Sequence, residues 1–119
     1  MDNLKTVPQP RPSFQYRGCR TLNGTAVVLV GGRRLGLYLK LFNHSPTGFE
    51  WGFGGSGPAQ LALAILAHHF GPGGRDLAVK LHQAFKRAVV AGLPKMEWTL
   101  TSGDVAAAVQ QLSAGGTPS

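Results

Sequence analysis

The chain has 119 residues, which is enough for one domain, and its hydrophobic fraction of 43% is ordinary for a globular core. Twelve Lys and Arg against five Asp and Glu give a formal net charge of +7, which favours polyanionic partners. Because Cys19 is the only cysteine, an intramolecular disulfide and a cysteine-based zinc cluster are excluded. The longest apolar run, 61–67, is too short to span a bilayer. We expect a cytoplasmic protein with no membrane contact. No motif in the sequence indicates a cofactor, so none is expected.

Composition divides the chain into three parts. Residues 1–13 are rich in proline and lack the apolar centre of a signal peptide, so we expect a flexible arm there. Residues 14–112 carry regular apolar patterns without an internal repeat and are predicted to form a single α+β domain. Residues 113–119 are mostly small and are predicted to form a flexible tail.

The first half of the domain predicts antiparallel strands. Residues 14–21 alternate between two faces, with Phe14 and Tyr16 on one and Arg17 and Cys19 on the other. Asn23-Gly24 is a turn dipeptide, and 25–30 is a near-continuous apolar run, typical of a strand buried on both faces. Gly31-Gly32 then predicts a two-residue hairpin turn.

A return strand and a fourth strand are predicted next. Four leucines alternate with more polar positions: Leu35, Leu37, Leu39 and Leu41 against Arg34, Gly36, Tyr38 and Lys40. Residues 43–48 read as a loop, and 49–53 as a short fourth strand. The pattern therefore predicts a meander of three to four antiparallel strands in the N-terminal half.

The second half predicts about three helices that pack against this sheet. Pro58 suits a first helical position with Gly57 or Ser56 as the cap, and 61–67 is apolar on every side, as in a central buried helix. A second helix over 75–91 carries an apolar stripe made of Leu77, Leu81, Phe85, Ala88 and Val89. After a connector with extended character at 98–100, Thr101 and Asp104 predict a capped final helix that runs to Leu112.

The run SPTGFEWGFGGSGPAQLALAIL, residues 45–66, resembles the core motif of a family of small uncharacterised bacterial proteins. That family is also common on phages, plasmids and other mobile elements. Later pieces of the chain are similar to it in the same order: Leu81-x-x-x-Phe85-Lys86, Leu93-Pro94 and Trp98-x-Leu100-Thr101. The resemblance covers residues 14–112 and implies a compact α+β fold and a mobile-element origin. It brings no catalytic residue.

The glycine-rich loop inside this motif has two interpretations. Without the lysine of a P-loop or the spacing of a dinucleotide fingerprint, it favours a packing role, in which glycines let the chain turn tightly into a buried helix. The alternative is a backbone nest for one phosphate, formed by Gly54, Gly55, Ser56 and Gly57. We expect Glu50 to accept hydrogen bonds from loop N–H groups or to pair with an arginine, and Gln60 to bond backbone of the same loop.

Catalytic patterns are sparse, so the chain is not expected to be an enzyme. His44, Ser56 and Glu50 are the residues of a conceivable hydrolytic site, but no nucleophile elbow or triad spacing supports them. His68 and His69 are adjacent and His82 stands alone, so no helical metal pair is predicted.

Basic residues are the stronger candidates for binding. We expect five residues on or near one exposed sheet face: Arg17, Arg20, Arg34, Tyr38 and Lys40. Arg33 and Arg34 lie at a predicted hairpin tip, and the second helix offers another patch made of Lys80, Lys86 and Arg87.

Two functions from different classes follow. The first is a non-enzymatic interaction protein of a phage or other mobile element that binds a host complex, for example to inhibit a nucleoprotein defence system such as CRISPR. The second is an accessory protein that binds DNA or RNA directly through the basic sheet face and hairpin. A small enzyme built around Glu50, His44 and Ser56 is a further alternative.

Overall fold

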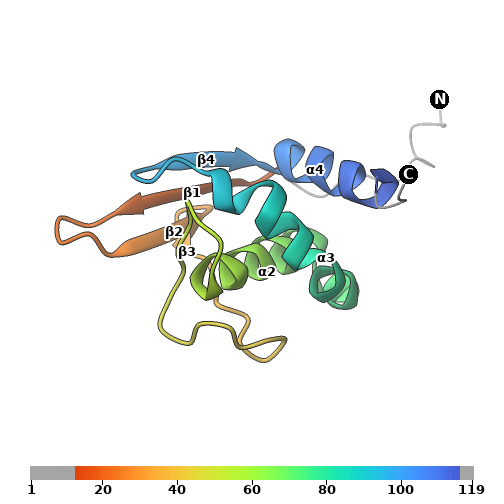
Figure 1. Cartoon of the computed structure of the whole chain (residues 1–119), viewed down its shortest axis with the longest axis horizontal. Helices are drawn as coiled ribbons and strands as arrows, with labels where there is room; N and C mark the ends of the chain where they lie inside the picture. The colour runs from red at the N-terminus through yellow and green to blue at the C-terminus, as the bar shows by residue number, and fades with distance from the viewer. Residues whose placement is uncertain (1–12, 116–119) are drawn as a thin grey trace.

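The computed structural model describes residues 13–115, so most of the predicted arm and tail lie outside the described residues. A four-stranded antiparallel sheet, in the order β3-β2-β1-β4, is packed against helices (Figure 1). The strands are β1 Gln15–Arg20, β2 Ala26–Val30, β3 Arg33–Arg34 and β4 Trp98–Thr101. The α-helices are α2 Ser56–Phe70, α3 Arg75–Ala88 and α4 Ser102–Gly115, with short 3₁₀ turns η1 Pro72–Gly74 and η2 Val90–Gly92. The predicted α+β class is confirmed.

The turn between β1 and β2 and the turn between β2 and β3 form as predicted, because both have the required glycines. Gly24 has φ +86°, and Gly31 and Gly32 at the next turn have φ +60° and +80°. Left-handed backbone of this kind is accessible to glycine without strain, and two such residues in succession match the right-handed twist of a hairpin.

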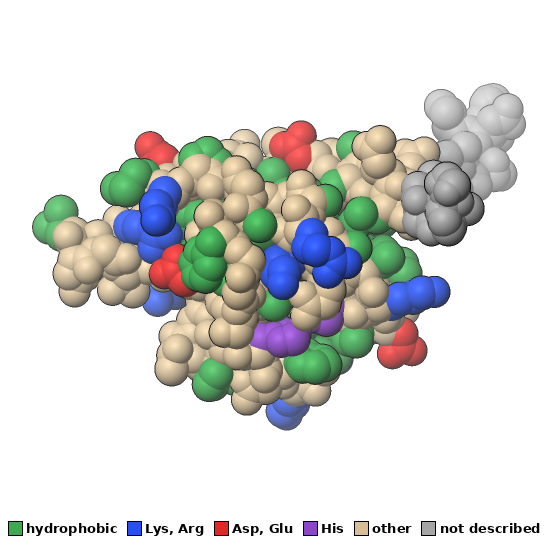
Figure 2. Space-filling model, viewed as in Figure 1, with side chains coloured by type: hydrophobic (Ala, Val, Ile, Leu, Met, Phe, Trp, Pro, Cys, Tyr) green, Lys and Arg blue, Asp and Glu red, His purple; other side chains and the backbone are tan. Residues whose placement is uncertain are grey.

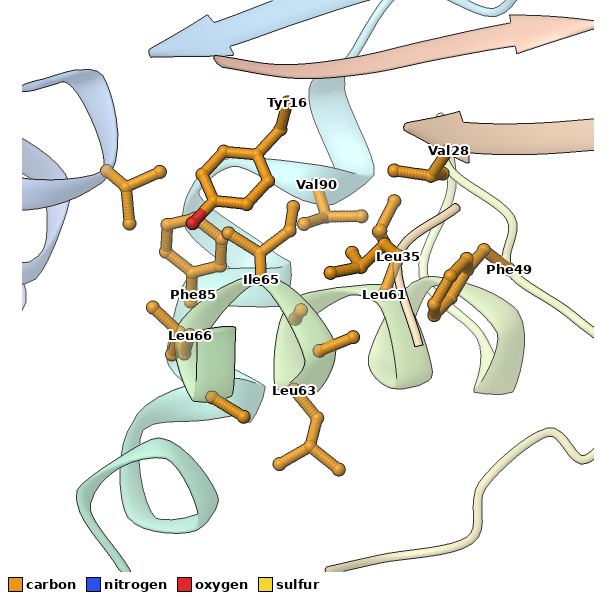
Figure 3. Close-up of a cluster of buried hydrophobic side chains, with 14 of the residues drawn as sticks. Tyr16, Val28, Leu35, Phe49, Leu61, Leu63, Ile65, Leu66, Phe85 and Val90 are labelled. Atoms are coloured by element: carbon orange, nitrogen blue, oxygen red, sulfur yellow. The ribbon is translucent and has the colours of Figure 1, made fainter. Parts of the chain in front are cut away.

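The prediction that residues 25–30 are buried on both faces is wrong. Only Val28 is buried within β2, and its other residues are half-buried. The helices cover one face of the sheet, where Val28 and Tyr16 point towards α2 (Figure 3). The opposite face is left uncovered by the described helices (Figure 1).

The predicted return strand ends far earlier than the leucine alternation suggests. Pairing stops at Arg34, and residues 35–41 are irregular, with Tyr38 in left-handed backbone at φ 56°. Leu35 is buried in the core, and the backbone carbonyl of Leu37 is bonded by the Gln60 side chain. The segment therefore leaves the sheet and runs over α2.

The fourth strand is also misplaced by the sequence pattern. Residues 49–53 form no strand, although Phe49 and Trp51 are both buried, and the N–H of Gly52 donates to the carbonyl of Val90 in η2. The strand that completes the sheet is β4, which pairs antiparallel with β1 from Gln15–Thr101 to Gly18–Trp98.

Helix α2 is the centre of the molecule, as predicted. Residues 58–67 are all buried, because the sheet covers one side of α2 and α3 packs along another (Figure 3). The helix begins at Ser56 after an N-cap at Gly55, so Pro58 is its third residue and not its first. Its missing N–H is tolerated there because the first four N–H groups of a helix have no intrahelical partner.

The buried side of α3 differs from the predicted stripe. Ala78, His82 and Phe85 are buried, whereas Leu77 is 41% exposed and Ala88 is exposed. The small side chain of Ala78 allows close approach to α2, and His82 is placed inside by a partner described below.

The capping box of α4 is confirmed: Thr101 Oγ1 accepts from the N–H of Asp104, and Asp104 Oδ2 accepts from the N–H of Thr101.

Candidate functional site

Two arginines lie on the uncovered face of the sheet. In the ladder Arg17 is paired with Leu29, and Leu29 is paired with Arg34, so all three side chains project from the same face. Both arginines are exposed. Adjacent strands lie about 4.8 Å apart, so the two arginine backbones are separated by roughly 10 Å. The structure thus brings together two of the five residues that the sequence places on this face.

Arg20 lies on the opposite side of β1 and is not a surface cation. Its guanidinium binds both carboxylate oxygens of Glu50, at 2.9 and 3.2 Å, and lies 4.5 Å from the ring centroid of Trp51. The side chain is only 12% exposed. The expectation that Glu50 pairs with an arginine is confirmed, and the expectation that Arg20 shares the exposed face is wrong.

This ion pair joins the glycine-rich motif to the sheet. Hydrogen bonds from Arg20 lower the pKa of the Glu50 carboxyl, outweighing the opposing effect of burial. Arg20 Nε and the indole N–H of Trp51 both donate to the carbonyl of Lys95, at 2.9 Å each. A bidentate pair stacked on an indole fixes the planes of both groups, so these residues have a structural role.

The glycines of the motif are explained mainly by packing. A Cβ at Gly57 would lie 2.8 Å from the Cβ of Glu50, and one at Gly55 would lie 2.8 Å from the ring of Phe53. Gly52 has φ +86°. The start of α2 therefore passes against Glu50 at a distance that only glycine allows, while anion binding by residues 54–57 stays a prediction.

Tyr38 and Lys40 lie beyond the sheet, contrary to the prediction. They border a hollow of about 370 Å³ between the irregular segment and the start of α3. Its walls come from Leu37, Tyr38, Leu39, Lys40, Leu41 and Arg75. Tyr38, the aromatic residue predicted to stack on bases, therefore does not lie on the outer sheet face.

The basic patch predicted on α3 is divided between two directions. Lys80 and Arg87 are seven residues apart, so they share one exposed side of the helix. Lys86 is half-buried and its charge acts on His44. Figure 2 shows basic side chains beside histidine side chains in the middle of the face that it displays.

A histidine pair that the sequence did not predict lies beneath this patch. His82 Nδ1 lies 2.6 Å from the carbonyl of Val79, to which it donates, and its Nε2 lies 2.9 Å from Nε2 of His44. Because Nδ1 of His82 carries its proton, the neutral pair has His44 as donor and His82 as acceptor. The ring of Phe42 stacks on His44 at 4.2 Å.

Gln60 anchors the irregular segment that carries His44, a role that the sequence pattern did not predict. It bonds backbone of residues 37–45 and not of the glycine-rich loop: Oε1 accepts from the N–H groups of His44 and Ser45, and Nε2 donates to the carbonyls of Leu37 and Phe42. All four hydrogen-bonding positions of the amide are used. A lone glutamine within the apolar run of α2 was the available signal.

The histidine pair predicts a specific dependence of stability on pH. Burial, followed by the charges of His82 and Lys86, lowers the pKa of His44 below its ordinary value of 6.5. Below pH 6.5 the unfolded chain therefore binds more protons at His44 than the folded protein does. The contribution of neutral His44 to the free energy of unfolding is thus complete above that pH and is lost as the pH falls. Urea unfolding at pH 5.0 and 7.5 should show a larger loss for the wild type than for His44→Asn. Equal losses in the two proteins would contradict this assignment.

These contacts separate the residues of the conceivable hydrolytic site. His44 is bonded to His82 and Glu50 to Arg20, and Ser56 is exposed at the start of α2. Among residues 13–115 no group of three or more His, Cys, Asp or Glu side chains could hold a metal ion. Within the same span no helix is long and apolar enough to cross a membrane.

The fold and surfaces define a small α+β protein with a helix-backed sheet whose outer face carries two exposed arginines. The chain belongs to the family described as "Family of unknown function (DUF6166)", whose match covers residues 16–111. This confirms the resemblance to a family without an assigned function. Neither a curated protein nor a solved structure matches the chain.

Proposed function

We propose that this protein is a non-enzymatic binding module that holds nucleic acid by its phosphate backbone on the outer face of the sheet. The observation that carries the proposal is the placement of Arg17 and Arg34 on either side of Leu29. Exposed guanidinium groups on an otherwise uncovered face are suited to bidentate phosphate contacts.

The distribution of the acidic residues supports this choice. Glu50 is neutralised by Arg20, and Asp104 is engaged in the cap of α4. Arg33 is also exposed, next to the Gly31–Gly32 turn, but it pairs with Val30, so its side chain projects from the opposite face of the sheet to Arg34. Backbone contacts of this kind carry little sequence information, so binding should be general and strongly dependent on salt.

The test compares two charge reversals of equal size. Arg17→Glu with Arg34→Glu changes the sheet face, and Lys80→Glu with Arg87→Glu changes the α3 face by the same net charge. Fluorescence anisotropy with labelled single-stranded and duplex DNA and RNA should show wild-type binding at 50 mM salt. The sheet pair should lose about ten-fold or more in affinity and reduce the salt slope by about 2, while the helix pair changes little.

Two results would overturn the proposal: no wild-type binding at low salt, or equal losses in both charge-reversed proteins. The first would favour a protein partner, as in the expected interaction protein of a mobile element that binds a host nucleoprotein complex. Circular dichroism of each variant establishes that the fold is retained.

A further inference from the structure

The edge of β2 that faces β3 is only partly paired. β2 has five residues and β3 has two, and their ladder joins Leu29 to Arg34 and Val30 to Arg33. One more hydrogen bond, from the N–H of Leu35 to the carbonyl of Val28, lies beyond these pairs. Within residues 13–115 no strand pairs with Ala26 or Val27 on this side.

The hydrogen-bond pattern shows which backbone groups face the open edge. The N–H of Thr21 donates to the carbonyl of Thr25, so odd-numbered residues of the second strand direct their backbone groups to β1. Even-numbered residues then point away from β1, as the bond received by Val28 shows. The N–H and the carbonyl of Ala26 therefore point out of the sheet edge, while Leu35 lies opposite Val28.

A groove lies along these groups. A hollow of about 240 Å³ has residues 25–28 on one side, and Leu35, Leu37 and residues 47–49 on the other, with Arg34 also on its wall. Open edges are commonly protected by proline, lysine or a bulge. Residues 25–28, Thr-Ala-Val-Val, contain none of these protecting residues.

We propose that this groove takes an extended acidic peptide of a partner protein, which adds to β2 as a new strand. The main chain of the peptide would bond the N–H and the carbonyl of Ala26, as in other cases of strand addition to a sheet edge. An acidic side chain of the peptide would meet Arg34. A second copy of the chain is the less suitable occupant, because edge pairing would bring together two proteins of charge +7.

This inference goes beyond the proposed function and does not depend on it, since its main-chain contacts are made by the edge of β2, and Arg34 is the one residue that the two surfaces share. The probe is a displayed library of random linear heptapeptides, selected on the full-length protein. Selected peptides should be acidic, free of proline at their centre, and should slow hydrogen exchange at the amide of Ala26.

Two matched changes then test the backbone contact. Ala26→Pro removes an N–H that faces the groove, which an edge strand tolerates, and Ala26→Val keeps it. A selected peptide should bind Ala26→Pro at least about ten-fold more weakly, and its N-methylated form should bind the wild type similarly weakly, while Ala26→Val changes little. Arg17→Glu should leave peptide binding unchanged, which separates this site from the nucleic-acid face.

The inference fails if no selected peptide slows exchange at the Ala26 amide in the wild type, or if N-methylation has no effect on binding. It also fails if gel filtration shows a dimer in which the Ala26 amide is already protected without peptide. The exchange measurement uses the wild-type protein, so the test holds even if Ala26→Pro does not fold.

Discussion

Replacing Gln60 by leucine is expected to lower the free energy of unfolding by about 4 kcal/mol, because leucine fills a similar space and leaves four backbone groups without partners. The amide is fully buried and joins the carbonyls of Leu37 and Phe42 to the N–H groups of His44 and Ser45. Urea unfolding followed by circular dichroism measures the loss.

The matched control is Gln111→Leu on the exposed side of α4, which should change stability by less than about 0.5 kcal/mol. Hydrogen exchange gives a local readout, since the amides of His44 and Ser45 should lose protection in Gln60→Leu before the rest of the protein does. Unchanged protection at these two amides would contradict the role assigned to Gln60.

Features that depend on local chemistry were predictable from the sequence. The turns at Gly24 and at Gly31–Gly32 require left-handed backbone that glycine supplies, and the Thr101–Asp104 box satisfies the N–H groups next to it. The all-round apolar pattern of 61–67 indicated a central helix, because such a helix must be covered on every side.

Strand pairing was less predictable, because alternation identifies buried side chains and not backbone partners. Phe49 and Trp51 are both buried as a strand would have them, yet the backbone that follows bonds η2. The alternating leucines of 35–41 likewise have no strand partner. Gln60 bonds the carbonyls of Leu37 and Phe42 and holds this segment over α2. Both partners are distant in sequence, so no local pattern shows them.

In the candidate site, too, some features were predictable from the sequence and others were not. Extending the alternation of β1 from Tyr16 would have placed Arg20 on the inner side, so that correction was available from the sequence. The contact between His44 and His82 was not, because it joins an irregular loop to a helix 38 positions away. The register that places Arg34 beside Leu29 follows from the hairpin turn alone.

Replacing Gly18 by alanine is expected to destabilise the protein by about 3 kcal/mol, although alanine is normally acceptable in a strand. Gly18 is paired with Trp98 across β1 and β4, and the indole lies over the glycine so closely that a Cβ would overlap it. Trp98 is 5% exposed and meets Trp51 edge to face, with ring centroids 5.5 Å apart. Any shift of the indole away from a new methyl group would disturb this packing.

A double-mutant cycle with Trp98→Leu tests this cause directly. If the overlap with the indole produces the loss, Gly18→Ala should cost less than about 1 kcal/mol in the Trp98→Leu background, because the smaller side chain leaves room for the new methyl group. Gly54→Ala is the matched control, since nothing lies within 4 Å of a Cβ at that position, and it should be nearly neutral. A Gly18→Ala loss that is the same with and without the indole would show that the strand backbone, and not Trp98, requires glycine there.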